Sequence, residues 1–361
     1  MSALSFLRRF PIPRTLKVPV WAIDISDASV KYLELKESHG IIMLGAYGEE
    51  PLAPGIVQSG GRIEKVPELT LVLKKIAALH SIEYVALSLP EEQAYLFEAT
   101  LPNMKEADLR SSLELDLEEH IPVPPADVVF DYEITKVPLS EKDPYELAVA
   151  ALQKNIVNNY LEVCTGADLS PVSFEIEAHA VARSLIPKGA QETIMLVDLG
   201  KTRTGIAIGD NRGVFFSSTV SLGGEAITQA ISRALSVSRE EAEQIKVSKG
   251  VSRSRKDEDL FAGLVPVLSA LKDELSRHVT FWRTHPAVDG KPRPPITRVL
   301  LAGGQANMPG LAEFLSSGLG LGVTAGNPWV NIPLGGSVPE MPYATSLRYT
   351  TTLGLALRSL L

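Results

Sequence analysis

The 361-residue chain contains one cysteine, few aromatic residues and no long hydrophobic run. Cys164 cannot form an internal disulfide, and the helical spacing of its apolar neighbours predicts a place in the core. No apolar stretch approaches the roughly 18 residues that cross a bilayer, and the N-terminus has no signal-peptide pattern. We therefore expect a protein that stays in the cytosol.

Several chemical signatures are also missing. A net charge of −8 argues against a broad nucleic-acid surface, which needs clustered basic residues. The six histidines show no metal-ligand spacing, so a zinc site is not expected. Neither a Walker A loop nor a Gly-x-Ser-x-Gly elbow is present, which argues against P-loop enzymes and serine hydrolases.

One short segment departs from the acidic balance. Residues 1–19 carry four basic residues and no acid, interleaved with apolar side chains. Such a segment could touch an anionic membrane surface or a partner protein. A frayed tail without a partner is an equally open interpretation.

The strongest positive feature is a duplicated segment. VWAIDISDASVKYLEL at 20–35 and IMLVDLGKTRTGIAIG at 194–209 both consist of an apolar run, an aspartate, a polar turn and a second β-patterned run. A third strand and a helix follow each copy, the first helix beginning at Pro67 with Leu69, Leu73, Ile76 and Leu79 on one face. Two like domains facing each other across a ligand-binding cleft are expected.

The chain length also requires more than one domain. Between the copies, a strand-like segment, a helix with Leu109, Leu113 and Leu117 on one face and two more strands predict a small α+β insertion that serves as a partner platform. The acidic face of that helix is equally expected of a solvated surface. We predict an α/β fold with these units: a tail at 1–19; domain I from 20–89, 171–192 and 342–361; an inserted subdomain at 90–170; domain II from 193–230 and 297–341; and a helical subdomain at 231–296.

Both aspartate turns have the composition of a phosphate site. Backbone N–H groups converge in tight polar turns, and the second turn adds Gly200, Lys201 and Thr202. Asp198 at the strand end is placed to hold a hydrated Mg²⁺, and Asp24 is its mirror partner. Either aspartate taken alone is as well explained as a turn residue that caps local backbone.

A third candidate ligand-binding turn, rich in glycine, follows another apolar run. Gly303 and Gly304 end VLLAGG and precede a helix, so they would allow close backbone approach by a base or ribose.

The three points together resemble the actin-like ATPase superfamily, with two phosphate motifs and an adenosine motif in order. Within it, the chain resembles the PilM family of type IV pilus assembly proteins more than the division protein FtsA, because the sequence ends at its last helix. The matching segments include AIDISDASVKYLEL, VDLGKTRTGIAI with SLGGEAIT, AEQIK and LAGGQANMPGLAEFLSSGLGLGVTAGNPW. The resemblance implies duplicated actin-like (ribonuclease H-like) domains.

Further site residues are implied by this resemblance. Asp24, Ser26 and Lys31 correspond to the first phosphate motif, and Asp198, Gly200 and Thr202 to the second. The remaining correspondences are Gly223, Gly224 and Glu225 near the ribose, Glu243 and Lys246 beside the adenosine, and Gly303, Gly304 and Asn307 in the adenosine motif. ATP and Mg²⁺, held through water by Asp24 and Asp198, are the implied cofactors.

Two features bear on hydrolysis and affinity. Ser26 and Asp27 stand where the family usually has glycine and a small hydroxyl residue, and a carboxylate facing a phosphate weakens binding. Glu177, just before a helix, resembles the acid that orients the attacking water in bacterial actins, with Glu175 as reserve. The alternative for Glu177 is a helix N-terminal carboxylate, and we expect slow or absent turnover.

The sequence thus predicts a cytoplasmic ATP-binding scaffold at the inner-membrane pilus platform. By resemblance it binds the cytoplasmic tail of a PilN-like membrane protein in a nucleotide-responsive way, and other platform components or self-association are possible. A sugar or acetate kinase, an FtsA-like filament protein and an adaptor that no longer binds nucleotide are the alternatives.

Overall fold

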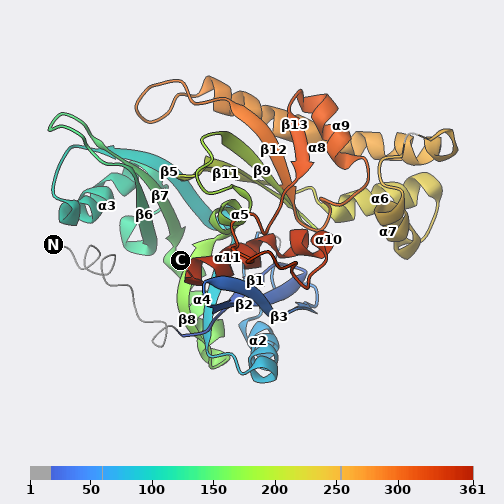
Figure 1. Ribbon diagram of the computed structural model, residues 1–361, viewed down its shortest axis with the longest axis horizontal. Coiled ribbons are helices and arrows are strands. Elements are labelled where there is room, and N and C mark those ends of the chain that lie inside the picture. Colours follow the sequence, from blue (N-terminus) through green and yellow to red (C-terminus); the bar gives the residue numbers. More distant parts are fainter. Residues whose placement is uncertain (1–17, 59, 253, 361) are drawn as a thin grey trace.

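The duplicated segments fold as matching halves of two sheets. The computed structural model describes residues 18–58, 60–252 and 254–360, so most of the basic tail predicted at 1–19 lies outside the described residues. In both copies an apolar run, a turn and a second run pair as antiparallel strands. Figure 1 shows the two sheets stacked one above the other, with the inserted subdomain at one end and helices at the other.

The first sheet has the strand order β3-β2-β1-β4-β8. The central strand β1 runs antiparallel to β2 and parallel to β4. Its alternate side chains face two different cores, with Ile23 on one side and Ala22 on the other. The strands are β1 (Val20–Ile25), β2 (Ser29–Ser38), β3 (Ile41–Pro51), β4 (Tyr84–Leu89) and β8 (Ser170–Ile176).

The second sheet repeats that plan in the order β11-β10-β9-β12-β13. Here β9 takes the place of β1, antiparallel to β10 and parallel to β12. The predicted duplication is therefore confirmed in the topology. The strands are β9 (Thr193–Leu199), β10 (Thr204–Asp210), β11 (Gly213–Val220), β12 (Ile296–Ala302) and β13 (Gly322–Ala325).

Helices cover both sheets and one helix is shared. α2 (Val66–His80) and α4 (Lys154–Gly166) pack together in the core below the first sheet, while α11 (Thr350–Leu360) packs on its other face. α5 (Glu177–Leu185) lies between the sheets, contacting α11 as well as β9 and β10. The second sheet is covered by α6 (Gly224–Leu235), α8 (Glu258–Thr284) and α9 (Leu311–Leu319), and α7 (Arg239–Ser248) packs on α6.

The inserted subdomain has its own sheet and core. Its strands β5 (Ala94–Leu101), β6 (Val128–Lys136) and β7 (Tyr145–Gln153) have the order β5-β7-β6, covered by α3 (Leu109–His120). Leu109, Leu113 and Leu117 are buried there, as their spacing predicts. We place the end of this subdomain at Gln153 and not at residue 170, because α4 packs against α2 and β8 pairs with β4.

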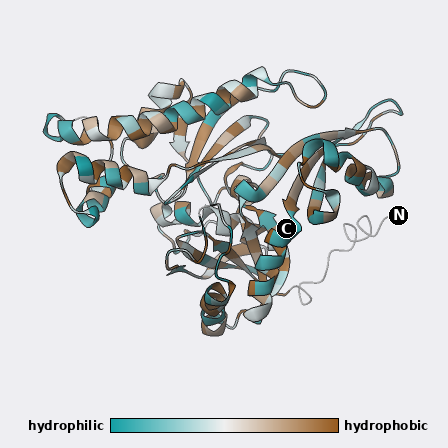
Figure 2. Cartoon of the chain, turned by 180° about the vertical axis from the view of Figure 1, so that it is seen from behind, coloured by the Kyte–Doolittle hydropathy of each residue, from teal (hydrophilic) through white to brown (hydrophobic). Residues whose placement is uncertain are grey.

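Two further expectations concern buried positions. Cys164 is buried in the core, as predicted. Leu79 was expected on the buried face of α2 but is 69% exposed, because it lies about 120° around the helix axis from Leu73. Figure 2 shows hydrophobic residues concentrated in the central strands. Among the described residues, no helix is both long and apolar enough to span a membrane.

Candidate functional site

The turn between β1 and β2 places two charged residues side by side. Asp24 and Lys31 are register partners, and Lys31 Nζ lies 3.9 Å from Asp24 Oδ2. The Ser88 hydroxyl at the end of β4 donates to Asp24 Oδ1 at 2.7 Å. Asp24 is buried, so its carboxylate is fixed from two sides near the C-terminal end of the central strand β1.

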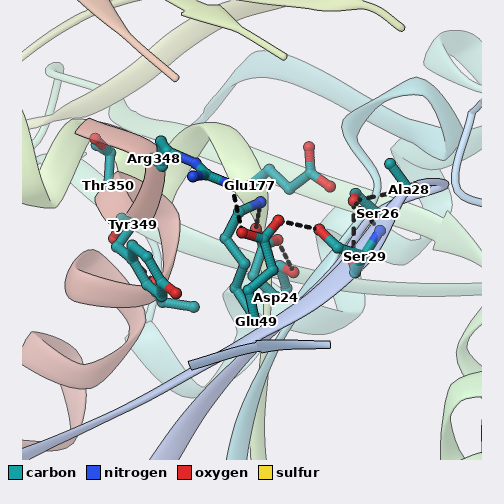
Figure 3. Close-up of polar contacts among 12 residues, drawn as sticks. Asp24, Ser26, Ala28, Ser29, Glu49, Glu177, Arg348, Tyr349 and Thr350 are labelled. Carbon is teal, nitrogen blue, oxygen red and sulfur yellow. Dashed lines mark hydrogen bonds and ion pairs between the residues drawn. The ribbon is translucent and has the colours of Figure 1, made fainter. Parts of the chain in front are cut away.

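The Ser26 side chain forms hydrogen bonds with the backbone of its own turn. Its Oγ accepts hydrogen bonds from the N–H groups of Ala28 and Ser29 and donates to Ser29 O. Ser29 Oγ in turn donates to Glu49 of β3 at 2.7 Å, and Arg348 pairs with the same carboxylate. Figure 3 shows Ser29 and Arg348 converging on Glu49. The Ser26 side chain thus uses its hydrogen bonds within its own turn.

The turn between β9 and β10 is supported by the start of α6. Gly224 N donates to Gly200 O, and Glu225 N donates to Lys201 O. A Cβ on Gly223 would lie only 2.7 Å from Lys201 O, so glycine is required for this approach. The phosphate-like turn and the N-terminus of α6 therefore form one rigid unit.

The third predicted point lies directly beside Asp198. Gly303 has φ 83°, and a Cβ there would be 2.5 Å from Asp198 Oδ1. Gly304 faces only the side chain of Arg348. Asn307 Nδ2 donates to Ala344 O, which ties the turn to α10 (Tyr343–Ser346). The glycines bring this turn against the second aspartate.

Lys246 joins α7 to the first turn of α6. Its side chain is buried, and Nζ donates to Thr228 Oγ1 at 2.9 Å and to Glu243 Oε2 at 2.7 Å. It also donates to Gly224 O. Glu225 pairs with Arg239 of α7. This pair of helices forms one wall of the cleft.

These pieces surround a single cleft of about 1320 Å³ between the two sheets. Two predicted residues do not line it: Gly223 lies behind the turn, and Glu175 is buried in ion pairs with Arg183 and Arg358. The predicted residues that line the cleft are Asp24, Ser26, Lys31, Glu177, Asp198, Gly200, Lys201, Thr202, Gly224, Glu225, Glu243, Lys246, Gly303, Gly304 and Asn307.

The carboxylates in the cleft repel one another. Burial, and next the charge of Asp24, raises the pKa of Asp198 to about 6. Among the described residues, no group of three or more histidine, cysteine or acidic side chains could hold a metal ion alone. Two hard oxygen donors without a third fit a Mg²⁺ ion that keeps its waters and takes its other ligands from phosphate. The donor set therefore fits the predicted ion.

A sequence model of the family described as type IV pilus assembly protein PilM matches residues 22–360. The chain belongs to the PilM family. It is therefore an actin-like protein of type IV pilus assembly, and the predicted resemblance to PilM is confirmed.

Solved structures of similar proteins agree on the fold. A PilM–PilN type IV pilus biogenesis complex is 23% identical to this chain, with a TM-score of 0.75 over 96% of this chain and 99% of that one. EutJ from Carboxydothermus hydrogenoformans is 17% identical (TM-score 0.54; 98% and 96% covered). MreB 5 of Spiroplasma citri, bound to AMPPNP, is 12% identical (TM-score 0.54; 97% and 100% covered). The predicted actin-like fold is thus confirmed.

A curated relative matches over a shorter stretch. The ethanolamine utilization protein EutJ of Escherichia coli (strain K12) is 32% identical over 119 residues, which is 33% of this chain. The match spans only 36% of that relative's own length.

In this PilM-family chain, the predicted water-orienting acid is engaged by an arginine. Arg203 Nη2 lies 3.0 Å from Glu177 Oε1 and 3.2 Å from Oε2. Burial raises the pKa of Glu177 to about 8; Arg203 opposes this rise, while Asp24, Glu92 and Asp198 add to it. A protonated or arginine-bound Glu177 is a poor base for an attacking water.

Asp27 also has a partner across the cleft. Thr202 Oγ1 donates to Asp27 Oδ2 at 2.6 Å, so the two phosphate-like turns are directly bonded. The sequence indicated the unusual acid but not its partner, because the two positions lie in different domains.

Sequence reasoning missed the acids that follow β4. Glu91 and Glu92 belong to the 3₁₀ turn Glu91–Gln93, and Glu92 Oε1 lies 2.9 Å from Arg203 Nε. Glu91 and Arg348 also line the cleft. The available signal is a pair of acids directly after a buried strand, within the range 90–170 predicted for the insertion.

Proposed function

We propose that this chain is a nucleotide-responsive scaffold of type IV pilus assembly. It binds ATP with Mg²⁺ in the cleft between its two actin-like domains and binds the cytoplasmic tail of a PilN-like membrane protein. The observation that carries the nucleotide part is the convergence of Asp24, Asp198 and Gly303 on one cleft. PilM-family membership and the likeness to a PilM–PilN complex support the partner.

The cleft offers a separate group to each part of the nucleotide. The backbone at Gly200–Thr202 and the side chain of Lys201 suit phosphate oxygens. Asp24 and Asp198 would hold a hydrated Mg²⁺, which neutralises phosphate charge when bound. Close approach at Gly303 and Gly304, with the wall formed by α6 and α7, leaves room for the base and ribose.

We propose that hydrolysis is slow or absent. The side chain best placed to orient a water, Glu177, is held by Arg203 on both oxygens. Catalysis would require the pair to separate, which leaves a buried charge without its partner. A role as a binding switch needs no turnover, only different affinities for the open and closed cleft.

Calorimetry with ATP tests the nucleotide part. We expect binding at millimolar or lower dissociation constants, dependent on Mg²⁺ and abolished by Asp198→Ala. Asp289→Asn, an acid in a loop outside the cleft, is the control and should bind like wild type. Equal heats for wild type and Asp198→Ala would refute the nucleotide role.

The partner is tested with a synthetic peptide of the cytoplasmic tail of the PilN-like protein from the same organism. We expect saturable binding by fluorescence anisotropy and an affinity that changes when ATP and Mg²⁺ are added. A scrambled peptide of the same composition serves as the control. Absence of binding would refute the scaffold role.

One observation favours an adaptor that no longer binds nucleotide. The hydrogen bond from Thr202 to Asp27 joins the two turns at the place proposed for phosphate, and the carboxylate repels phosphate charge. Asp27→Asn removes the negative charge while keeping a hydrogen-bond acceptor. If only Asp27→Asn binds ATP and wild type binds the tail peptide without it, the adaptor is correct.

A further inference from the structure

The segment that leads from domain I into the inserted subdomain carries three glutamates, and each reaches a residue of domain II, which includes here its helical subdomain at 231–296. Glu91 Oε1 accepts a hydrogen bond from Thr219 Oγ1 of β11 at 2.9 Å. Glu92 Oε1 lies 2.9 Å from Arg203 Nε, and Glu98 Oε2 lies 2.5 Å from Arg293 Nη2. Residues 91–98 are therefore bonded to domain II, although this segment begins directly after β4 of domain I.

These contacts are shielded from water. Glu91 is buried, and the side chains of Glu92, Glu98, Arg203 and Arg293 are each less than one-fifth exposed. An ion pair at this depth is difficult to break, since either charge left alone is poorly solvated. Exposed ion pairs contribute far less.

Arg293 is held in place before it meets Glu98. Its guanidinium lies 4.4 Å from the centre of the Trp282 ring, and Trp282 Nε1 donates to Pro294 O at 2.7 Å. Trp282 thereby holds both Arg293 and the next residue, Pro294, of the loop that follows α8. The position of the Arg293 guanidinium is therefore fixed before it pairs with Glu98.

Packing joins the insertion to both domains: α4 of domain I contacts β6 and β7, and Leu152 of β7 lies in the core of domain I. β11 of domain II contacts the Glu91–Gln93 turn, β5 and β7, and Figure 1 shows β5 leading from that edge into the insertion. Polar contacts with domain I are made by Gln93 to Gly60 O and by Lys154 to Ala126 O. Among the described residues, the ion pairs that link residues 91–153 to the rest of the chain both go to domain II.

We propose that the inserted subdomain moves with domain II, held by Glu91, Glu92 and Glu98, and not with the domain I into which it is inserted. Arg203 lies in the phosphate-like turn and pairs with both Glu92 and Glu177. Phosphate bound at that turn would act on the same part of domain II, so a movement of domain II on nucleotide binding would carry the inserted subdomain with it. This last step rests on the proposed nucleotide binding, whereas the attachment does not.

Distances between spin labels on the full chain test the attachment. Labels go on cysteines at three exposed sites: Ser140 in the insertion, Ser317 in domain II and Leu79 in domain I. The buried native Cys164 is not expected to take a label. On adding ATP and Mg²⁺, we expect the 140–79 distance to change and the 140–317 distance to stay constant.

The substitutions Arg293→Ala and Glu98→Gln, made together, release one anchor outside the cleft. We expect the 140–317 distribution to broaden without nucleotide, while a fluorescent ATP analogue binds with wild-type affinity. Arg298→Ala, which breaks a pair with Glu192 just before β9 and leaves the insertion's contacts intact, is the matched control. Thermal unfolding confirms that each variant is folded.

The outcomes separate the two proposals. If the distribution of 140–317 distances is unchanged in the folded double variant, the proposed attachment is wrong. It is also wrong if ATP changes the 140–317 distance in the wild type and leaves the 140–79 distance constant. A wild type that binds no ATP analogue overturns the nucleotide role. Broadening of the 140–317 distribution in that same protein would still support the attachment.

Discussion

The two copies of the strand-turn-strand unit have the same topology but use their turns differently. In the first copy, Ser26 bonds the backbone of its own turn, and Asp24 pairs with Lys31 on the neighbouring strand. In the second copy, Thr202 and Arg203 reach across the cleft to side chains of domain I. One turn is closed locally, and the other joins the domains.

A single register position accounts for much of this difference. Lys31 is the strand partner of Asp24, and the equivalent partner of Asp198 is Gly205. A Cβ on Gly205 would lie 2.5 Å from Glu91 Oε1. Glycine here makes space for the acid that follows β4. The two strand-turn-strand units thus share one backbone topology, and their side chains make the second turn the contact between the domains.

The largest effect is expected where the second copy crosses the cleft. Arg203→Ala leaves the Glu92 carboxylate buried without its cation and removes the hydrogen bonds that Glu177 accepts, so we expect a loss of about 3–5 kcal/mol in unfolding free energy. Urea unfolding followed by tryptophan fluorescence measures this. A loss below 1 kcal/mol would mean that the pair contributes no more than an exposed one.

The acid that Arg203 holds predicts a pH dependence. Burial raises the pKa of Glu177 from its ordinary 4.5 to about 8, so the folded chain keeps a proton that the unfolded chain releases. This contribution is fully present below pH 4.5 and is lost as the pH rises through 8. At about 1.4 kcal/mol per pKa unit, the loss is on the order of a few kcal/mol.

Comparison with Glu177→Gln isolates that contribution, since the amide does not titrate. We expect the wild-type unfolding free energy to fall between pH 5 and 8 relative to the variant. Parallel pH profiles for the two proteins would rule out the raised pKa.

A moderate effect is expected at the position where the copies diverge. Gly205→Ala places a methyl group against the Glu91 carboxylate, and overpacking of this kind costs about 1–3 kcal/mol. Urea unfolding of the single variant and of Gly205→Ala with Glu91→Ala measures the coupling. If the second substitution does not relieve the first, Glu91 is not the reason for glycine.

The smallest effect is expected in the self-contained turn. Ser26→Ala removes hydrogen bonds to Ala28 and Ser29, worth about 1 kcal/mol. Because these bonds stay within one turn, the label distances between domains should not change. A shift in those distances would show that the first turn also participates in domain coupling.

Much of the site could be predicted from local sequence. The repeated pattern around Asp24 and Asp198 predicted the strands and turns. Residue spacing also placed Leu109, Leu113 and Leu117 in the core of the insertion. These predictions succeeded because hydrogen bonds and side-chain periodicity act over a few neighbouring residues.

The boundary of the insertion and the roles of particular acids could not be predicted in that way. Helix α4 resembles any amphipathic helix, and only packing against α2 assigns it to domain I. Glu175 is the reserve catalytic acid of the sequence analysis, yet Arg183 of α5 and the distant Arg358 of α11 pair with it outside the cleft.

The sequence by itself determined the duplicated α/β units, their paired aspartates and the glycines that permit close backbone contact. Tertiary structure alone decided that Asp27 meets Thr202, that Arg203 engages Glu177 and Glu92, and that the insertion is anchored to domain II. The reason is that charge pairing and desolvation depend on which buried groups meet in space, and those partners come from segments far apart in the chain.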